Sequence, residues 1–450
     1  MPELNRLIQL MKQLEDQLIV CMRCGLCQAV CPLYAQTGRE SDVARGKLAL
    51  LDGLINKMFD DPEGTYQRLD KCLLCGSCQA NCPSGVSALE IFMKARAILT
   101  GYLGLSPAKK FVLRGLLAHP KRLDYMVRWG AKFQKLFSRP ANDVIGSSCA
   151  RFMSPLIGDR HFMPLADQPF HTQVPSLNTR GGRSGLRVAF YVGCLLDKIY
   201  PRVAHAVLKA LDFHEVDVFM PESQACCGIP AISSGDLQTF EKLVGHNIQR
   251  FADEKVDFLV TACATCTSTI KEVWPVMLSK ASPVYDQARQ LAAKTMDINQ
   301  FLVTQVGAAA DGIQQPQPTV SVTYHDPCHL KKAQGVWREP RQLLQASGYC
   351  LFREMPQADA CCGMGGSFNL RYYGISSKIG QLKIDNISAT QCNMVATGCP
   401  ACMLQLSDIL SKSGKGIAVR HVIEIYAESL KRHDTSIKAH QAQENLRSGL

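Results

Sequence analysis

The stretches CMRCGLCQAVCP, residues 21–32, and CLLCGSCQANCP, residues 72–83, decide the character of the N-terminal part of this chain. Both follow the spacing C-x2-C-x2-C-x3-C-P, which is the pattern that ligates a pair of cubane [4Fe–4S] clusters. The first three cysteines wrap a short loop around one corner of a cube. The fourth points away, and the proline after it turns the backbone out of the site. The repeated pattern therefore predicts two cubane [4Fe–4S] clusters.

The fourth cysteine of each run is expected to bind the cluster of the other run, as it does in two-cluster ferredoxins. One predicted ligand set is Cys21, Cys24, Cys27 and Cys82, and the other is Cys72, Cys75, Cys78 and Cys31. Zinc binding and a disulfide framework are the alternatives. Zinc sites usually pair two C-x2-C hooks rather than a run of three cysteines and a Cys-Pro, so the spacing favours clusters.

The segment between the two runs, residues 32–71, is longer than in a compact bacterial ferredoxin and carries helical patterns. In ARGKLALLDGLINKMF, residues 44–59, apolar side chains recur at helical spacing. Ser41-Asp42, just before it, has the pattern of an N-cap. We therefore expect residues 1–101 to form an α-helical ferredoxin domain with both cubane motifs.

The composition is that of a soluble protein with more than one domain. The chain has 450 residues, of which 46% are hydrophobic and 20% are charged. Its 21 cysteines are clustered, unlike those of a small disulfide-stapled secreted protein, and they imply a reducing compartment. Residues 1–20 lack the apolar core of a signal peptide, and no stretch approaches the roughly 20 apolar residues needed to cross a bilayer. A cytoplasmic location is therefore expected.

The formal charge of +11 does not by itself indicate a nucleic-acid partner. The count treats every cysteine as a neutral thiol, whereas a [4Fe–4S] core with four thiolates adds negative charge. The excess is also concentrated between Lys109 and Arg139, where Asp124 is the single acidic residue. We therefore expect no nucleic-acid partner.

Residues 101–140 alternate basic with bulky apolar side chains and are expected to form two short amphipathic helices, broken at Pro120. Two interpretations remain open. In one, the helices lie on the anionic inner surface of the cell membrane, near a quinone pool. In the other, they form a packed connector with a solvated positive face, or a docking face for a partner. The region of helices and linker is expected to cover residues 102–186.

The rest of the chain is an internal duplication, with expected units at residues 187–306 and 319–432. The segment VDVFMPESQACCG of the first unit corresponds to LFREMPQADACCG of the second, and equivalent cysteines are 134 to 136 residues apart. Short β-rich runs alternate with helical stretches, which predicts βα units around a largely parallel sheet. The cysteines that follow the strands should then meet at one edge of the sheet.

Each unit contains a lone cysteine, then a vicinal Cys-Cys-Gly, then C-x2-C. The first set is Cys194, Cys226, Cys227, Cys263 and Cys266, and the second is Cys328, Cys361, Cys362, Cys399 and Cys402. Adjacent cysteines do not easily occupy two corners of one tetrahedral ion, because consecutive side chains in extended backbone diverge. They suit a larger or opened cluster in which thiolates bridge irons. The glycine after each pair is expected to let the backbone approach the inorganic core.

This arrangement resembles the CCG-domain family, which includes heterodisulfide reductase subunits and the iron–sulfur subunits of glycolate and lactate dehydrogenases. The resemblance implies that each five-cysteine set holds a noncubane [4Fe–4S] cluster, built from two fused halves with bridging thiolates. Both sets are complete here, so the implication extends to all ten cysteines. The alternatives are a zinc hook, a vicinal disulfide or a thioredoxin-like C-x2-C, and duplication of all five positions disfavours them.

Together these patterns predict an α+β multidomain protein, in which the α-helical ferredoxin domain precedes a duplicated α/β CCG (cysteine-rich) domain. Three cysteines fall outside any set and are expected to be buried structural thiols: Cys149, Cys350 and Cys392. His325 and His329 flank the first cysteine of the second set. Either is a candidate to donate a hydrogen bond to cluster sulfur or to move a proton, although structural histidines are commoner.

No segment has the pattern of a flavin, NAD or nucleotide site. A chain with up to four clusters and no organic cofactor site passes single electrons and leaves hydride chemistry to another protein. The whole order resembles the iron–sulfur subunit of glycolate or D-lactate dehydrogenase. The resemblance implies an FAD-binding 2-hydroxy-acid dehydrogenase subunit as partner, with electrons passing through the clusters to a quinone or another carrier.

Two other functions remain open at this point. A heterodisulfide-reductase-like subunit would cleave a disulfide at its noncubane clusters by successive one-electron steps. A non-enzymatic iron–sulfur or zinc scaffold would neither relay electrons for a dehydrogenase nor cleave a disulfide. The dehydrogenase and disulfide-reductase interpretations share the same ligands and differ in where the chemistry occurs.

Overall fold

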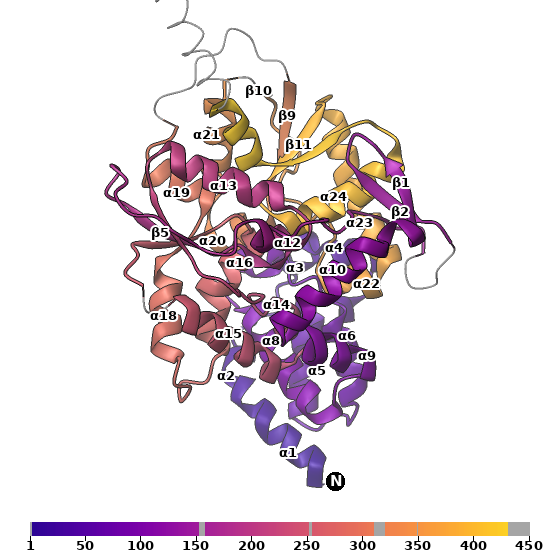
Figure 1. Ribbon diagram of the computed structural model, residues 1–450. Coiled ribbons are helices and arrows are strands. Elements are labelled where there is room, and N and C mark those ends of the chain that lie inside the picture. Colours follow the sequence, from indigo (N-terminus) through magenta and orange to yellow (C-terminus); the bar gives the residue numbers. More distant parts are fainter. Residues whose placement is uncertain (1, 153–157, 252–253, 310–319, 349, 431–450) are drawn as a thin grey trace, which may run out of the picture.

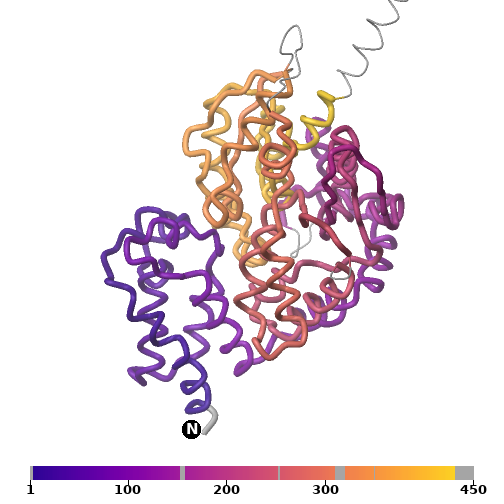
Figure 2. The backbone as a smooth tube through the Cα atoms, turned by 90° about the vertical axis from the view of Figure 1, so that its left-hand side faces the viewer, coloured from indigo at the N-terminus to yellow at the C-terminus, as the bar shows by residue number. Residues whose placement is uncertain are grey.

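The computed structural model describes residues 2–152, 158–251, 254–309, 320–348 and 350–430. Figure 1 shows a helical N-terminal region packed against two α/β units. In Figure 2, turned by 90°, the same N-terminal region forms a lobe beside the rest of the chain. The predicted fold class, a helical domain followed by a duplicated α/β domain, is confirmed.

The helical domain covers residues 2–103, and the structure describes no strand within that range. Its helices are α1 (Pro2–Met11), η1 (Lys12–Leu14), α2 (Glu15–Leu18), α3 (Leu26–Val30), α4 (Pro32–Thr37), η2 (Glu40–Asp42), α5 (Ala44–Ile55), α6 (Pro62–Asp70), α7 (Ser77–Ala80) and α8 (Ala88–Leu103). On α5, the side chains of Leu48, Leu51 and Ile55 recur at helical spacing and are buried. The helix predicted there is confirmed.

The N-cap predicted at Ser41-Asp42 is wrong. Helix α5 begins at Ala44, and its cap position, Val43, makes no side-chain hydrogen bond to the helix. Asp42 is buried instead, and its carboxylate pairs with Lys71 Nζ at 3.3 Å. Leaving a buried carboxylate without a cation costs more free energy than leaving a helix end without a cap. The contact with Lys71 therefore decides where the Asp42 side chain lies.

Arg96 on α8 fastens the helical domain to the first α/β unit. Its side chain is buried, and it donates hydrogen bonds to the carbonyl oxygens of Leu69 at 3.2 Å and Ser233 at 2.7 Å. Thr100, one turn along α8, donates to the carbonyl oxygen of Ser234 at 3.3 Å. Because a buried guanidinium must have its donors satisfied, these bonds fix the position of α8 against the unit.

Residues 104–186 contain more structure than the predicted helices and linker. The helices are α9 (Pro107–Lys110), the π-helical segment η3 (Phe111–Leu117), α10 (Pro120–Phe137) and α11 (Phe170–Gln173). The predicted break at Pro120 is confirmed. The predicted linker is wrong in part, because β1 (Ser138–Asn142), β2 (Ser147–Ala150) and β3 (His161–Phe162) form an antiparallel sheet. Cross-strand pairing of such short segments leaves little periodicity in the sequence.

The first α/β unit is built on a five-stranded sheet in the order β4-β6-β5-β7-β8. Its strands are β4 (Leu177–Asn178), β5 (Arg187–Phe190), β6 (Asp217–Met220), β7 (Phe258–Thr261) and β8 (Thr295–Asp297). Its helices are α12 (Gly193–Lys198), α13 (Pro201–Phe213), α14 (Ile229–Ser233), α15 (Leu237–Phe251), α16 (Ala264–Ser268), η4 (Thr269–Val273), α17 (Trp274–Met277), α18 (Tyr285–Lys294) and α19 (Ile298–Thr304). All strand pairs are parallel except β4 with β6, and β4 comes from the predicted linker.

The second unit has a four-stranded parallel sheet in the order β10-β9-β11-β12. Its strands are β9 (Val320–His325), β10 (Cys350–Phe352), β11 (Met394–Thr397) and β12 (Ala418–His421). Its helices are α20 (Cys328–Gln334), α21 (Glu339–Ala346), α22 (Ser367–Arg371), α23 (Tyr373–Ala389) and α24 (Pro400–Ser413), and residues 422–430 are helical. This order repeats β6-β5-β7-β8 of the first unit. The predicted boundaries at 319 and 432 lie outside the described residues.

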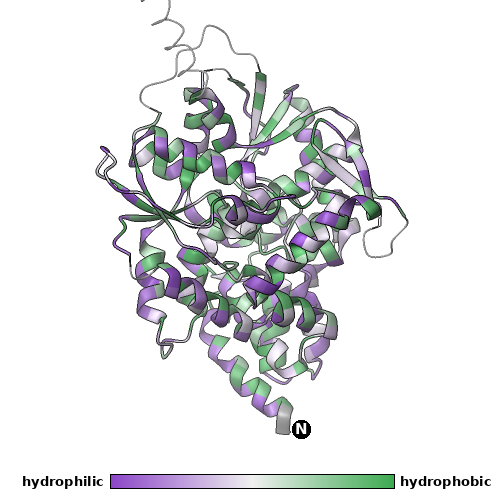
Figure 3. Ribbon diagram, viewed as in Figure 1, coloured by the Kyte–Doolittle hydropathy of each residue, from purple (hydrophilic) through white to green (hydrophobic). Residues whose placement is uncertain are grey.

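Helices cover the two parallel sheets, whose strands are rich in buried apolar side chains. Val188 and Phe190 on β5 and Val260 on β7 are fully buried, as parallel strands require. Figure 3 shows hydrophobic residues along the strands, whereas the surface helices alternate between hydrophilic and hydrophobic residues. The cysteines of the two sets follow the carboxyl ends of these strands. As expected, the parallel topology therefore brings the cysteines of each unit to one edge of its sheet.

Candidate metal centres

One of the two predicted cubane ligand sets lines a single cavity. Cys31, Cys72, Cys75 and Cys78 all border one small cavity, together with the buried Lys47. The first of these cysteines comes from one run and the other three from the other run. The structure therefore brings together the four residues that the ferredoxin rule groups, including the one exchanged between runs.

The two cysteine runs share an unusual backbone. Arg23 and Leu74 precede the second cysteine of each run, and both have positive φ, at 58° and 53°. Few side-chain-bearing residues adopt this conformation, and it bends both loops in the same way. Helices α3 and α7 then begin directly after the bends. Local strain at equivalent positions is typical of loops shaped around a bound group.

The thiols around this cavity are poorly solvated, so they ionise readily only next to a positive charge. Burial raises the pKa of Cys31 to about 11, and the neighbouring thiolates of Cys72 and Cys75 add to the increase. Burial also raises the pKa of Cys78. Such thiols would be neutral without a cationic centre. All 21 cysteines are free thiols, so the donor set fits iron and not a disulfide framework.

The other predicted cubane set is more open. Burial raises the pKa of Cys27, and the nearby Cys21 contributes to that increase, so these two thiols are neighbours. Cys24 is exposed, and Cys82 is partly buried and accepts a hydrogen bond from the backbone N–H of Val86 at 3.4 Å. The assembly of these four cysteines into one ligand set stays a prediction.

The five thiols of the first CCG set form a continuous row. Cys194 Sγ lies 4.0 Å from Cys226 Sγ. Cys227 contacts both Cys226 and Cys266, and the backbone N–H of Cys266 donates to Cys263 Sγ at 3.4 Å. All but the first of the five are buried. The hydrogen bonds from its two neighbours, Cys226 and Cys266, lower the pKa of Cys227.

The second CCG set repeats this arrangement. Cys328 contacts Cys361, and Cys362 contacts both Cys361 and Cys402. Cys402 in turn contacts Cys399. Here the hydrogen bonds from Cys361 and Cys402 lower the pKa of Cys362, the counterpart of Cys227. Hydrogen bonds from Cys263 and Cys402 also lower the pKa of Cys399, whereas the pKa of its counterpart Cys263 is raised, so the two units share one favoured thiolate and differ at another.

The glycine after each vicinal pair is crowded by protein atoms, and the predicted approach of its backbone to an inorganic core stays a prediction. Gly228 and Gly363 have φ of 95° and 93°, where side chains are strained. A Cβ on Gly228 would lie 2.7 Å from the Phe240 ring, and one on Gly363 would lie 2.6 Å from the carbonyl oxygen of Ser376. The crowding comes from protein atoms, so these glycines are required for the turn and for helix packing.

Two direct contacts join the separate thiol sets. Cys75 of the cubane cavity contacts Cys361 of the second CCG set. Cys263 of the first CCG set contacts Cys399 of the second. A small apolar cluster that includes Leu33, Leu73 and Phe368 surrounds the first of these contacts, so it is shielded from water. The cubane cavity and both CCG sets therefore form one connected row of sulfur atoms.

The two candidate histidines have separate environments. His325 is fully buried, and its ring lies with Cys362 and Cys402 so that their possible ligand atoms are within 4.8 Å of one another. Burial lowers the pKa of His325 to about 3, so it is neutral at physiological pH and suited to binding metal or donating to sulfur rather than to moving a proton. His329 Nε2 donates to the carbonyl oxygen of Leu74 at 3.0 Å, which makes it a link between domains.

The three cysteines outside the sets are not all buried. Cys392 is buried, as predicted, whereas Cys149 on β2 and Cys350 on β10 are half-buried. The prediction is wrong for these two cysteines because of the strands on which they lie. Strand β2 belongs to the small three-stranded sheet and β10 is an edge strand, and both are partly open to solvent.

Comparisons with known proteins agree with this arrangement. The family model described as a cysteine-rich domain (CCG) matches residues 188–271 and 322–407, and a 4Fe-4S dicluster domain matches residues 17–86. A Bacillus subtilis (strain 168) protein named "Probable glycolate oxidase iron-sulfur subunit" is 30% identical over 437 residues, which are 94% of this chain and 96% of that protein. This chain belongs to the CCG-domain family of iron–sulfur subunits.

Other members of the CCG-domain family differ in their named roles. A fumarate reductase (CoM/CoB) subunit of Methanothermobacter marburgensis is 28% identical over 414 residues, 90% of this chain and 71% of that protein. Lactate utilization protein A 2 of Bacillus cereus (strain ZK / E33L) is 29% identical over 247 residues, 55% of this chain and all of that protein. Membership supports [4Fe–4S] binding and an electron-transfer role. Among the described helices, none has the length and apolar character required to span a bilayer.

Sequence reasoning missed a group of polar residues beside the first CCG set. Asp197 and Lys198 on α12 follow Cys194 by three and four positions and pair with each other. His171, from the predicted linker, lies 3.3 Å from Asp197. The duplication offered a signal, because Lys332 occupies the place of Lys198 in the second unit, four positions after Cys328.

Proposed function

We propose that this chain is the electron-transfer iron–sulfur subunit of an FAD-dependent 2-hydroxy-acid dehydrogenase, an oxidoreductase that acts on D-lactate or glycolate. Its partner would be the FAD-binding subunit, and the electrons would pass to a quinone or another carrier. The single observation that carries this proposal is the connected row of thiols. It runs from the cubane cavity through Cys75 and Cys361 to Cys399 and Cys263.

The proposed ligands follow the sequence prediction. One cubane is assigned to Cys21, Cys24, Cys27 and Cys82, and the other to Cys72, Cys75, Cys78 and Cys31. Two noncubane clusters are assigned to the five-cysteine sets at 194–266 and 328–402. When bound, clusters of this kind take up and release one electron at a time. The chain's own contribution is to keep three of these ligand sets in contact, the second cubane set and the two five-cysteine sets, with most of their thiols buried.

The proposed location is the cytoplasm, with peripheral contact at the inner face of the cell membrane. The support is the outer face of α10, which exposes Tyr125, Trp129, Phe133 and Leu136 among lysines and arginines. The alternative, a packed connector, is less consistent with that exposure. Amphipathic helices with aromatic and basic side chains bind at the interface of anionic membranes.

The decisive experiment is an anaerobic co-purification. A flavoprotein should purify with the chain, and adding D-lactate or glycolate should bleach the visible absorption of the clusters. The readout depends on electron entry from a 2-hydroxy acid and not on the final acceptor. Material that binds iron but is never reduced by either acid in the presence of its flavoprotein would contradict the proposal.

A second function, reduction of a disulfide, is favoured by one observation. Both five-cysteine sets are complete and have the same internal contacts, whereas relaying electrons does not require two such sets. The similarity to the fumarate reductase (CoM/CoB) protein is compatible with it. Reoxidation of the isolated, reduced chain by a disulfide, with no quinone present, would favour this function. Reoxidation by a quinone alone would favour the first.

A further inference from the structure

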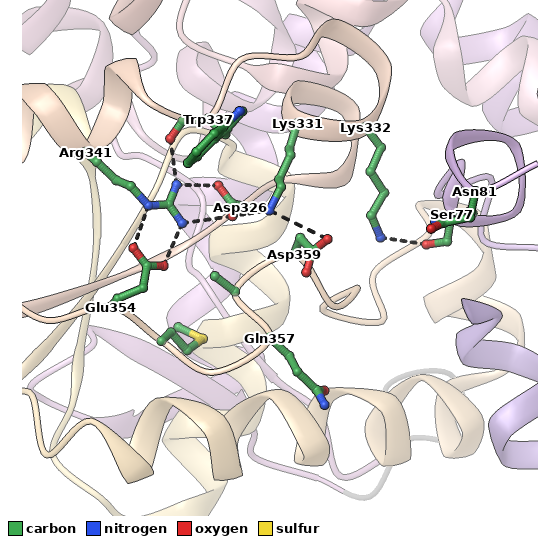
Figure 4. A network of polar contacts seen from close by, with 12 residues as sticks. Ser77, Asn81, Asp326, Lys331, Lys332, Trp337, Arg341, Glu354, Gln357 and Asp359 are labelled. Carbon is green, nitrogen blue, oxygen red and sulfur yellow. Dashed lines mark hydrogen bonds and ion pairs between the residues drawn. The ribbon is translucent and has the colours of Figure 1, made fainter. Parts of the chain in front are cut away.

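Helix α20 of the second CCG unit binds the cubane loop on both sides of Cys75. His329 Nε2 donates to the carbonyl oxygen of Leu74 at 3.0 Å, and Lys332 Nζ donates to Ser77 Oγ at 2.7 Å. Figure 4 shows Lys332 reaching across to Ser77 of the helical domain. Because His329 and Lys332 are three positions apart, they lie on one face of the helix. That face is therefore in contact with the loop that carries a predicted cubane ligand.

The bond from Lys332 determines how the Ser77 hydroxyl is oriented. An ammonium group donates hydrogen bonds and accepts none, so Ser77 Oγ must be the acceptor of this bond. The single hydrogen of the hydroxyl is then available to another acceptor, and Cys75 Sγ lies 3.4 Å from Ser77 Oγ. Ser77 is only 3% exposed, so water has little access to the bond. The hydroxyl therefore donates to the Cys75 sulfur, and the charge behind it strengthens that bond.

The charge of Lys332 is directed at the cubane ligands and not at a carboxylate. It forms no ion pair with any aspartate or glutamate among the described residues. Its neighbour Lys331 points elsewhere and pairs with Asp326 at 3.3 Å (Figure 4). The contact with Cys361 and burial raise the pKa of Cys75, whereas the charge of Lys332 acts in the opposite direction. Lys332 therefore favours negative charge on the Cys75 sulfur.

The first unit has no equivalent of this arrangement. Lys198 is the counterpart of Lys332, four positions after the first cysteine of its set. Its Nζ pairs with two carboxylates, of which Asp124 lies at 2.6 Å, so its charge is neutralised locally. Leu195 takes the place of His329 and has no side-chain donor. Of the two units, only the second thus presents an unneutralised cation and an imidazole donor to the helical domain.

A cation placed in this way affects the two predicted cubanes differently. Reduction adds one negative charge to a cluster, so a charge-assisted hydrogen bond to one of its thiolates stabilises the reduced state and raises the reduction potential. At the other cubane set, the charge of Arg45 acts on Cys27, but its guanidinium also pairs with Glu40 at 2.7 Å. The cubane next to the second CCG unit should therefore be the more easily reduced of the two.

We propose that Lys332, acting through Ser77, raises the reduction potential of the cubane assigned to the Cys75 loop and so directs electrons into the second CCG unit. The inference rests on the proposed function, because it uses the clusters assigned there. Lys332 is a positioning residue, since it orients the hydroxyl that bonds to the ligand. One electron enters from the flavoprotein and leaves to the second five-cysteine set. The Ser77 proton stays on its oxygen throughout, and no covalent bond forms or breaks.

The test is an EPR-monitored redox titration of the anaerobically purified full chain, with dithionite and mediators as reductant. The cubane signal that Cys75→Ser removes identifies the cluster to follow. Lys332→Met should lower its one-electron reduction equilibrium constant about tenfold, which corresponds to about 59 mV. Ser77→Ala should shift the midpoint in the same direction, and the double variant should shift it no further than Lys332→Met, because both changes remove one connected interaction. Lys332→Arg, which keeps a charged donor, should restore most of the parent value.

Lys331→Met is the matched control, because it removes the same charge from the same helix and should leave this midpoint unchanged. Iron and acid-labile sulfide contents verify that each variant carries its clusters, and Ser77→Ala decides the result if Lys332→Met loses iron. An unchanged midpoint in the loaded variants, or an equal shift in Lys331→Met, overturns the inference. The expected shift without bleaching by any 2-hydroxy acid supports the role of Lys332 and removes the proposed dehydrogenase function. Bleaching with an unchanged midpoint does the reverse.

Discussion

One difference between the two CCG units lies directly beside their thiols. The central strand of the second unit ends at His325, and the equivalent position in the first unit is Tyr191. The Tyr191 hydroxyl donates to the carbonyl oxygen of Ala225 at 2.6 Å, whereas the imidazole of His325 lies beside Cys362 and Cys402. Only the second set therefore has a nitrogen donor or ligand at this place, so the two clusters should have different reduction potentials.

Replacing His325 by phenylalanine tests this difference. A hydrogen bond to a thiolate stabilises the more negative, reduced state, so its loss should lower one midpoint potential by on the order of 60 mV, about 1.4 kcal/mol. The other midpoints should not change. An EPR-monitored redox titration measures this, with Tyr191→Phe as control, because its hydroxyl bonds to backbone. Identical midpoints in His325→Phe and the parent chain would contradict the role.

Asp297, at the end of β8, gives the first unit a pH-dependent stability. Burial raises the pKa of this carboxyl to about 7, despite hydrogen bonds from Asn299. Its pKa in the unfolded chain is about 3.9, so between roughly pH 4 and 7 the folded state binds more protons. The stability linked to this group is therefore fully present below pH 4 and is lost as the pH rises through 7.

Asp297→Asn should remove that dependence. Relative to the variant, the parent chain should lose stability between pH 5 and pH 8, by on the order of a few kcal/mol. Anaerobic urea denaturation at both pH values measures it. Asp212→Asn, at an exposed position on α13, should behave like the parent chain. A parent-to-Asp297→Asn difference that is the same at pH 5 and pH 8 would contradict the assignment.

At the scale of elements, α10 has a different function on each side. Gln134 fixes its inner side, donating to the carbonyl oxygen of Leu165 and accepting from its N–H, both at 2.9 Å. On its outer side the rings of Trp129 and Phe133 are 4.9 Å apart and exposed. A helix held firmly on one side, with exposed aromatic and basic side chains on the other, is suited to a surface that is not part of this chain.

Changing Lys121, Arg122, Lys132 and Lys135 to glutamine should weaken sedimentation with anionic vesicles at least tenfold. Each basic side chain near such a surface contributes about 1 kcal/mol, and neutral vesicles should show no such change. The matched control changes four exposed basic residues of the first unit: Arg250, Lys255, Lys280 and Arg289. Equal sedimentation of both variants with the parent chain would exclude the membrane role.

At the scale of the whole molecule, the helical domain and the two α/β units share one hydrophobic core and are arranged so that their thiols touch. Arg96 fixes the helical domain to the first unit, and His329 links the second unit to the loop at Leu74. These contacts hold the Cys75–Cys361 approach between residues far apart in the sequence. Electron transfer between the parts therefore depends on domain packing as well as on the ligands.

Cys75→Ser should disconnect the row at its entry to the second unit. We expect the loss of about four iron atoms per chain, because one cubane loses a ligand, and slower reduction of the remaining clusters by the partner. Iron and sulfide analysis with EPR of the reduced chain measures both effects. Cys149→Ser, outside every set, should leave iron and reduction unchanged. Equal iron contents in the two variants would contradict the assigned ligand.

Much of the fold and of the site was predictable from local patterns. The spacing within each cysteine run identifies cluster loops because ligand geometry is set over a few residues, and the break at Pro120 follows from a single ring. The N-cap at Ser41-Asp42 was wrong because Asp42 pairs with Lys71, a residue distant in sequence. The small sheet of β1 to β3 was missed for a similar reason. Its strands are stabilised by backbone hydrogen bonds to one another, which leave no pattern within a single strand.

The sequence by itself determined which cysteines are the candidate iron ligands and that two equivalent units follow a helical domain, because spacing and repetition are properties of the chain. Only the tertiary structure decided that the two units are used differently. Cys361 meets the cubane loop, whereas its counterpart Cys226 faces a cavity walled by α10. Duplicated sequences encode equal sites, and they become unequal through the neighbours that domain packing places against each one.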